Sequence, residues 1–134
     1  MITAQEFKTN FDHHALAVNN ITLSVDFYKN VLHLSQIDTP VDNPHIKWFS
    51  LGDKLQLHLI ETEELDIKTH KSNHFSVRVE NITNFITHLN TKKIPYWDWV
   101  GNKGKVALRP DGVQQVYIQD PDGYWIEIND AKYK

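Results

Sequence analysis

The chain has 134 residues, of which 40% are hydrophobic and 23% are charged, a balance typical of one folded globular domain. Its 14 basic and 17 acidic residues give a formal net charge of −3, so no basic surface is expected to attract a nucleic acid. The absence of cysteine excludes disulfides, thiolate nucleophiles and cysteine-based zinc sites. Any metal site must therefore use oxygen and nitrogen ligands.

The first ten residues are polar and have neither a cationic start nor an apolar stretch. No apolar run in the chain is long enough to cross a bilayer. We therefore expect neither a signal peptide nor a membrane anchor. The sequence predicts a cytoplasmic location, with which a chain free of cysteine is also consistent.

An internal repeat organises the chain. Residues 13–22 match residues 74–83 at five of ten positions, at a constant offset of 61. Because this offset is close to half the length, we interpret residues 1–134 as one domain made of two fused copies of the same unit. The two copies span about 11–61 and about 73–130.

Each copy begins with a strand of alternating polarity, continues through an asparagine suited to N-capping, and enters a helical period of apolar residues. The capping residues are Asn20 and Asn81. The helical periods comprise Val25, Tyr28, Val31 and Leu32 in the first copy, and Ile82, Phe85, Ile86 and Leu89 in the second. The charged segment 62–73 is predicted to link the copies.

Strand-like runs follow each predicted helix. In the first copy they span 46–51 and 55–61, with a turn at Gly52-Asp53 between them. In the second copy they span 96–100, 105–108, 114–119 and 124–129, interrupted by the turn sequences 109–112 and 120–123. The resulting pattern is βαβββ, twice, which predicts an α+β fold.

A second correspondence closes each copy. Gly52 and Gly123 are turn glycines, and each is followed four positions later by a polar residue, Gln56 or Glu127. We therefore treat Gln56 and Glu127 as candidates for equivalent positions in the two copies.

Alternation along the predicted strands separates a polar face from an apolar face. If each helix covers the apolar face of its copy, the polar faces together form a cavity. Such a cavity needs a metal, water or substrate to satisfy its polar groups. The residues expected to line it are His13, Gln56, His58, His74, Arg78, Glu127 and Asn129.

Two imidazoles and one carboxylate can hold a divalent metal and leave positions open for water or an oxygen substrate. The repeat selects His13, rather than His14, as the partner of His74, and Glu127 supplies the carboxylate. The carbonyl oxygen of Gln56 is a candidate fourth ligand. A single histidine on a strand is more often structural, so the metal hypothesis depends on the three residues occurring together.

These residues resemble the glyoxalase I, bleomycin resistance and extradiol dioxygenase superfamily, the vicinal oxygen chelate proteins. The resemblance runs over nearly the whole chain. It rests on Phe11-Asp12-His13 and the strand that follows, on the strand from His74, and most specifically on Asp120-Pro121-Asp122-Gly123-Tyr124-Trp125-Ile126-Glu127. The fold that it implies is a pair of βαβββ modules forming an open barrel around a metal.

The resemblance also implies a homodimer, in which His13 and Gln56 of one chain meet His74 and Glu127 of the other. The implied cofactor is one divalent ion per site, and zinc, nickel, cobalt, manganese and iron all remain open. Glyoxalase I usually has a second glutamate at the position of Gln56. The amide found here is more similar to methylmalonyl-CoA epimerase, which weakens an assignment to glyoxalase I itself.

The chemistry that the resemblance implies is Lewis-acid catalysis on a small substrate with vicinal oxygens. We expect Glu127 to move a proton next to a carbonyl, assisted by His58 or by water. Arg78 and Arg109, the only two arginines, are candidates for binding a substrate carboxylate or phosphate; a salt bridge and a solvated turn are their plainer interpretations. Trp125 is a candidate pocket wall, or else a core residue.

Three functions are open at this point. The first is a metal-dependent lyase or isomerase similar to lactoylglutathione lyase. The second is a metal-free binding protein of the bleomycin resistance type, against which the retained histidines and glutamate argue. The third is a metal-dependent dioxygenase or thiol transferase, which the same ligands allow. In each case the expected partner is a small molecule, with no nucleic acid and no membrane.

Overall fold

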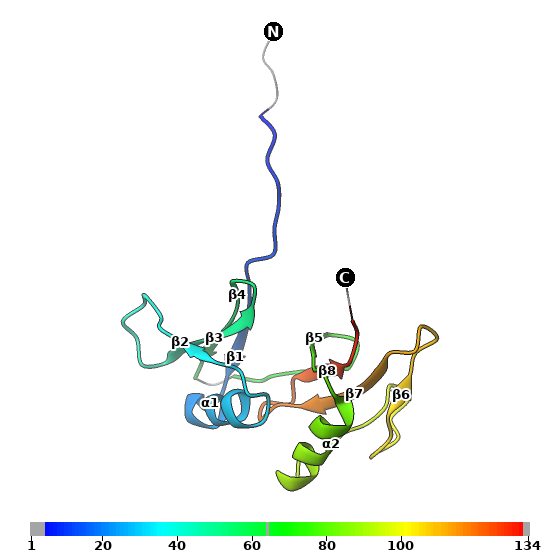
Figure 1. The fold of residues 1–134 in the computed structure, drawn as a ribbon. Helices are drawn as coiled ribbons and strands as arrows, with labels where there is room; N and C mark the ends of the chain where they lie inside the picture. Colours follow the sequence, from blue (N-terminus) through cyan, green and yellow to red (C-terminus); the bar gives the residue numbers. More distant parts are fainter. Residues whose placement is uncertain (1–4, 64, 133–134) are drawn as a thin grey trace.

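The computed structural model describes residues 5–63 and 65–132 and consists of two βαβββ modules (Figure 1). The first module contains β1 (His13–Val18), α1 (Ile21–Asn30), β2 (Gln36–Ile37), β3 (Ile46–Gly52) and β4 (Leu55–Glu61). The second contains β5 (His74–Arg78), α2 (Ile82–Thr91), β6 (Ala107–Leu108), β7 (Gln114–Gln119) and β8 (Trp125–Asn129). The predicted α+β class and the twofold βαβββ order are confirmed.

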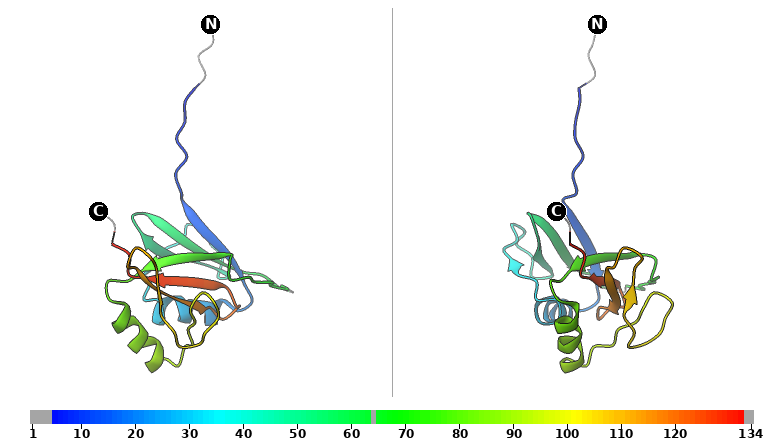
Figure 2. Two further views of the ribbon diagram at one scale, coloured as in Figure 1. Left: turned by 90° about the vertical axis from the view of Figure 1, so that its right-hand side faces the viewer. Right: turned by 45° about the vertical axis from the view of Figure 1, so that its right-hand side comes forward.

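Each module forms one four-stranded sheet, and the two sheets have equivalent strand orders, β1-β4-β3-β2 and β5-β8-β7-β6. The first strand of each module runs parallel to the last, and the other neighbouring strands are antiparallel. Both helices lie on the same side of the sheets (Figures 1 and 2). β1 and β5 are therefore edge strands, and each begins with a histidine.

Both helices begin at the asparagines that the sequence predicts as caps. The Asn20 side-chain oxygen accepts the Leu23 amide at 3.1 Å, and the Asn81 side-chain oxygen accepts the Asn84 amide at 2.9 Å. Each cap satisfies an amide of the first turn that has no partner within the helix. Neither helix in the described part of the chain is long and apolar enough to span a membrane.

One apolar core lies between the sheets and the helices and continues through both modules. Leu57 and Leu59 of β4, and Ile126 and Ile128 of β8, have no exposed surface. Because side chains alternate along a strand, the residues between them lie on the opposite face of each sheet. The polar residues Gln56, His58 and Glu127 are therefore turned away from the helices, as the alternation predicts.

A buried hydrogen bond joins the two modules. The Tyr28 hydroxyl in α1 donates to Asp120 Oδ2 at 2.7 Å, and Tyr28 has no exposed surface. The Asp122 and Tyr124 amides donate to the other carboxyl oxygen at 3.0 and 2.9 Å. Burial raises the pKa of Asp120 above its usual value despite these donors. This carboxyl group fastens α1 to the closing turn of the second module.

Replacing Tyr28 with phenylalanine is expected to lower the free energy of unfolding by about 1.5–3 kcal/mol, because the lost bond is buried and ends on a carboxyl group. Urea denaturation measures the change. Tyr96→Phe is the matched control, because the Tyr96 hydroxyl has no hydrogen-bond partner among the described residues. Equal losses in the two variants would contradict the role assigned to the Tyr28 hydroxyl.

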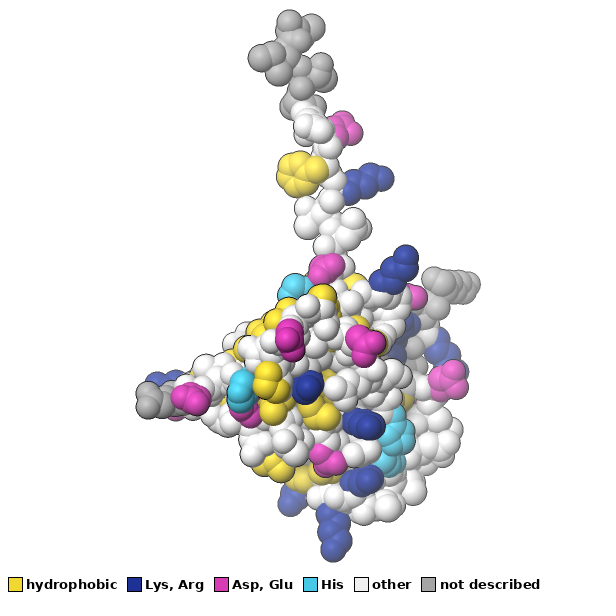
Figure 3. Space-filling model, turned by 90° about the vertical axis from the view of Figure 1, so that its left-hand side faces the viewer, with side chains coloured by type: hydrophobic (Ala, Val, Ile, Leu, Met, Phe, Trp, Pro, Cys, Tyr) yellow, Lys and Arg dark blue, Asp and Glu magenta, His cyan; other side chains and the backbone are white. Residues whose placement is uncertain are grey.

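The segment 5–12 runs away from the body of the protein before β1 begins (Figures 1 and 3). Phe7 and Phe11 are 86% and 64% exposed. The last residue of the segment, Asp12, already pairs with β4, because its carbonyl accepts the Gln56 amide at 3.3 Å. The first histidine of β1 consequently follows a paired residue and does not lie at a free chain end.

Three details of the strand prediction differ from the structure. The predicted strand at 96–100 contains only isolated bridges at Trp97, because Asp98 binds the amide and the side chain of Asn102 and turns the chain back. The predicted strand at 105–108 is reduced to β6, and no sequence pattern predicts β2. A two-residue strand is too short to show an alternating pattern.

Candidate functional site

The first polar cluster lies on the face of the first sheet opposite α1. It comprises Asp12, His13, Trp48, Gln56 and His58. The parallel register of β1 and β4 sets His13 beside Gln56. The His13 ring stacks on His58 at a centroid distance of 4.0 Å, and His58 stacks on Trp48 at 3.9 Å. The three rings form one continuous stack that holds both imidazoles in place.

Hydrogen bonds fix the ring nitrogens in the first polar cluster. His13 Nδ1 lies 2.6 Å from Asp12 Oδ2 and donates its proton to it, which leaves Nε2 to present a lone pair. His58 Nε2 lies 2.8 Å from Gln56 Oε1 and donates to it, because the amide oxygen only accepts. Burial, with a smaller contribution from His13, lowers the pKa of His58. His58 is therefore mostly neutral at pH 7.

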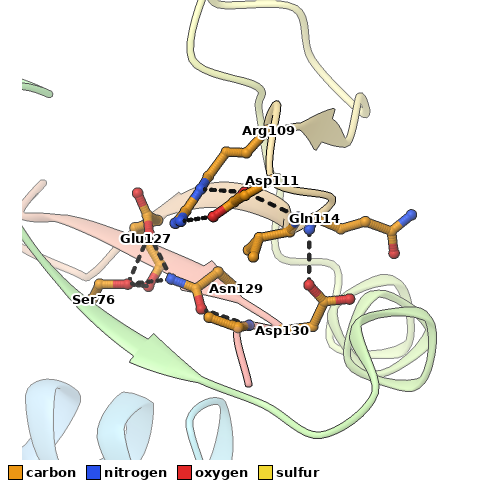
Figure 4. A network of polar contacts seen from close by, with 9 residues as sticks. Ser76, Arg109, Asp111, Gln114, Glu127, Asn129 and Asp130 are labelled. Carbon is orange, nitrogen blue, oxygen red and sulfur yellow. Dashed lines mark hydrogen bonds and ion pairs between the residues drawn. The ribbon is translucent and has the colours of Figure 1, made fainter. Parts of the chain in front are cut away.

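The second polar cluster occupies the corresponding face of the second sheet and comprises His74, Ser76, Tyr117, Glu127 and Asn129. Glu127 Oε1 accepts the Tyr117 hydroxyl at 2.8 Å. Glu127 Oε2 accepts the Ser76 hydroxyl at 2.9 Å and the Asn129 amide at 2.7 Å (Figure 4). His74 Nε2 lies 3.7 Å from Glu127 Oε1. Three donors thus hold the carboxylate in one orientation, facing an imidazole.

The protonation states in the second polar cluster suit a cation. Burial raises the pKa of Glu127, but the hydrogen bonds from its three neighbours outweigh burial and hold the pKa below its usual value. His74 Nδ1 lies 2.7 Å from the Lys71 carbonyl oxygen and donates to it, so in the neutral ring Nε2 is the nitrogen with the lone pair. The side chains of His74 and Glu127 are 23% and 12% exposed. An ionised carboxylate and an imidazole lone pair are common donors to divalent metals.

The strand register corrects the alignment of the two copies. Glu127 lies beside the residue two positions after His74. In the first module, His58 lies beside the residue two positions after His13. The position equivalent to Glu127 is therefore that of His58, not that of Gln56 as the turn glycines indicate.

The turn before the last strand of each module explains why the glycines mislead. Five residues, 51–55, separate the paired residues Ser50 and Gln56, and five residues, 120–124, separate the paired residues Gln119 and Trp125. At the same place in these turns stand Lys54, with φ 66°, and Gly123, with φ 87°. A lysine thus adopts the left-handed conformation that glycine adopts in the second copy. Aligning Gly52 with Gly123 shifts the comparison by two residues.

The two arginines have different surroundings. Arg78, at the end of β5, lines a cavity of about 850 Å³ between the modules. Arg109 binds the Asp111 carboxylate through Nη2 at 2.5 Å and Nε at 3.1 Å. Figure 4 shows this ion pair. The positive charge of Arg109 favours the ionised form of Tyr117 and so lowers the pKa of that residue, against the larger effects of burial and of Glu127, which raise it. Arg78 also lies beside Asn129 in the register of β5 and β8, so both arginines border the second polar cluster.

Trp125 packs edge-on against Trp97 at a centroid distance of 5.5 Å and so forms part of an aromatic wall. Trp48, which the sequence also offers as a pocket wall, lies in the first polar cluster. The sequence analysis missed the roles of Asp12, Lys71 and Tyr117 in the site. Trp48 lies directly across from His58, and Tyr117 directly across from Glu127, so these two aromatic residues are equivalent. Alternation along β3 and β7 could have placed both on the polar face, but only the register shows what they face.

The two clusters remain separate within one chain. In residues 5–63 and 65–132, no three or more His, Asp or Glu side chains form a group that could hold a metal ion. The single cavity expected from the sequence is thus divided in two within one chain. His13, Gln56 and His58 belong to the first polar cluster, and His74, Glu127 and Asn129 belong to the second.

Comparison with known proteins establishes the family. The sequence profile of the Glyoxalase/Bleomycin resistance protein/Dioxygenase superfamily matches residues 10–128. The chain belongs to this superfamily. The resemblance inferred from the two histidines and the Asp-Pro-Asp-Gly segment is thereby confirmed.

One curated relative is similar in sequence, and two solved structures are similar in fold. Glyoxylase I 4 of Arabidopsis thaliana is 28% identical over 126 residues, covering 90% of this chain and 70% of the relative. The oxidase ChaP-H2 superposes with a TM-score of 0.76 at 17% identity, covering 95% of this chain and 97% of the other. A lactoylglutathione lyase from Agrobacterium tumefaciens gives 0.68 at 18% identity, covering 94% and 96%. At these identities, the solved structures show a common fold that a lyase and an oxidase both use.

Proposed function

We propose that this superfamily member is a cytoplasmic, metal-dependent lyase or isomerase that acts on a small substrate with two neighbouring oxygen atoms. The orientation of two histidines carries the proposal. His13 and His74 each donate Nδ1–H to an oxygen, of the Asp12 carboxylate at 2.6 Å and of the Lys71 carbonyl at 2.7 Å, and each presents Nε2. Such partners are typical of metal-binding histidines, because they fix the tautomer and the ring orientation.

The proposed ligands are His13, His74, Glu127 and one residue of β4. The register supports His58 for the fourth position, since it is equivalent to Glu127. Gln56 is the other candidate for the fourth ligand. Its side-chain oxygen lies 2.8 Å from His58 Nε2, so the two side chains end in the same part of the first polar cluster. Imidazole and carboxylate donors suit zinc, nickel, cobalt, manganese or iron as the divalent ion.

We further propose that two copies of the chain complete the site. Each polar cluster lies on a sheet face turned away from the helices, and among the described residues neither one forms a metal-binding group by itself. A twofold symmetric dimer would set the first polar cluster of each copy against the second polar cluster of the other. Two identical sites per dimer would result.

The bound ion would supply Lewis-acid polarisation of the substrate oxygens. Glu127, ionised at neutral pH, would accept a proton from the carbon next to a carbonyl. The hydroxyls of Tyr117 and Ser76 and the Asn129 amide would keep the carboxylate oriented during the transfer. Burial lowers the pKa of His58, so its ring is mostly neutral at pH 7. If Gln56 and not His58 is the fourth ligand, the unbound imidazole of His58 would take up the proton in turn.

Metal analysis followed by an activity screen tests the proposal. The protein loaded with zinc or nickel is expected to hold about one ion per chain and to convert the adduct of methylglyoxal and glutathione. Chelation should abolish the conversion, and returning the same ion should restore it. No bound ion after loading with any of the five metals would contradict the metal site and favour a metal-free binding protein. A bound ion without conversion would contradict the lyase assignment.

A second candidate is a metal-dependent oxidase acting on a planar substrate. The aromatic residues of the two polar clusters, with the adjacent Trp99, favour it. Trp48 lies in the ring stack of the first polar cluster, and Trp99 packs against Tyr117 at a centroid distance of 5.5 Å beside the second. Such rings offer faces to a flat ligand. Oxygen consumption by the iron-loaded protein with an aromatic diol would distinguish an oxidase from a lyase.

A further inference from the structure

Lys71, in the segment between the modules, inserts its ammonium group among aromatic rings of the second module. Nζ lies 4.9 Å from the ring centroid of Trp125, 5.3 Å from that of Tyr117 and 5.8 Å from that of Trp99. A cation within about 6 Å of a ring face is attracted by the quadrupole of the ring. The three rings come from β8, β7 and the segment 97–103, so all three elements meet at this cation.

The ammonium group also holds the segment 97–103, called here the tryptophan hairpin, whose ends are joined by a bridge between Trp97 and Lys103. Nζ donates to the Asp98 carbonyl at 2.7 Å and to the Trp99 carbonyl at 3.1 Å. An apolar side chain of the same length could fill the space but could not satisfy these carbonyls. The ammonium group therefore makes contacts that apolar bulk alone could not replace.

The backbone of Lys71 contacts the second polar cluster. Its carbonyl oxygen accepts His74 Nδ1–H at 2.7 Å. Tyr117, one of the three rings around Lys71 Nζ, meets the His74 ring edge-on at 5.4 Å and donates to Glu127. Trp99 meets the same imidazole at 6.2 Å. Lys71 is therefore linked to the imidazole directly and to the carboxylate through one neighbour.

We propose that Lys71 is a positioning residue of the second polar cluster. Its ammonium group anchors the tryptophan hairpin as a wall beside His74, and its carbonyl keeps His74 Nε2 directed at Glu127. In this role Lys71 acts through His74 and touches neither the metal nor the substrate. The inference rests on the proposed function, because positioning His74 matters only if His74 binds a metal. The position of the tryptophan hairpin and the orientation of the His74 ring can nevertheless be measured without any metal.

Three variants test the inference. Lys71→Met keeps the chain length and removes the charge. Lys71→Arg keeps a cation that can lie over the same rings and donate to the same carbonyls. Lys68→Met is the matched control, because Lys68 is exposed in the same segment. The readouts in metal-free protein are amide hydrogen exchange over 97–104 and the ¹⁵N shifts of the two His74 ring nitrogens at pH 8. Titration with Zn²⁺ gives the metal affinity.

Lys71→Met is expected to speed amide exchange of Trp97, Gly101 and Gly104 on the order of tenfold, because the tryptophan hairpin opens more often. The ¹⁵N chemical shifts of its His74 ring nitrogens should move toward the values of a ring that exchanges between the two neutral tautomers. Its Zn²⁺ affinity should fall roughly tenfold, as when an outer partner of a metal-binding histidine is disturbed. Lys71→Arg should return all three readouts close to wild type, and Lys68→Met should change none.

Unchanged exchange rates and unchanged His74 shifts in Lys71→Met would overturn the inference, whatever happens to Zn²⁺ binding. If the wild-type protein binds no metal at all, the proposed function fails, while the two metal-free readouts still decide the role of Lys71. Should Lys71→Met fail to fold, Lys71→Gln, which keeps a donor without a charge, decides the question by the same two readouts.

Discussion

Replacing His74 with alanine is expected to lower bound metal well below one ion per chain and to weaken affinity by more than about 100-fold, because a proposed ligand is lost and not merely its support. The fold should persist. The His74 side chain is 23% exposed and its hydrogen bond is to a single backbone carbonyl, so the free energy of unfolding should change by less than about 1 kcal/mol. Metal analysis and circular dichroism measure the two effects.

His70→Ala is the control for this experiment, since His70 is an exposed histidine four positions earlier in the same segment. It should keep a full complement of metal. Unchanged metal content in His74→Ala would remove His74 from the site. Loss of metal together with loss of the circular dichroism spectrum would show that His74 maintains the fold instead.

Mixing two inactive variants is expected to restore metal binding. His13→Ala disables the first polar cluster of its chain, and Glu127→Ala disables the second polar cluster of its own chain. If each site is built from two chains, a mixed dimer contains one site with both defects and one intact site. After subunit exchange in an equimolar mixture, about half of the dimers are mixed, so about one quarter of the wild-type metal should return.

The reverse mixture provides the control. A chain carrying both substitutions is exchanged with wild-type chains at equal concentration. Sites shared between chains would then retain about one quarter of the metal, whereas sites contained within one chain would retain about one half. Native mass spectrometry reports whether mixed dimers form. Mixed dimers without recovered metal in the first mixture would rule out the shared site.

The two-module fold can be predicted from the sequence because its signals are local. Asn20 and Asn81 cap the helices in the structure as they do in the prediction, since a cap involves residues only a few positions apart. The alternation that places His13 and His74 on polar faces is equally local. Because the unit is duplicated, each signal occurs twice at a constant offset, which makes a chance match less probable.

The full composition of the polar clusters cannot be predicted in the same way, because it depends on register and on contacts between distant segments. Lys54 adopts a left-handed conformation without being glycine, so the sequence gives no sign that it matches Gly123. Lys71 lies in a charged segment whose sequence looks like a linker. The rings of Tyr117 and Trp125 come together around its ammonium group only when β7 and β8 pair. These residues meet only in the folded chain, and no periodic pattern in the sequence predicts that they do.

The correspondence between His58 and Glu127 would also set the charge of the proposed metal centre. One module offers an uncharged nitrogen donor where the other offers a carboxylate. Around a doubly charged ion, this pair would leave roughly one unit of positive charge uncompensated, whereas two carboxylates would cancel it. Chelating anions such as oxalate or a hydroxamate should therefore inhibit the protein more strongly than neutral diols of the same size, and the difference should shrink as salt concentration rises.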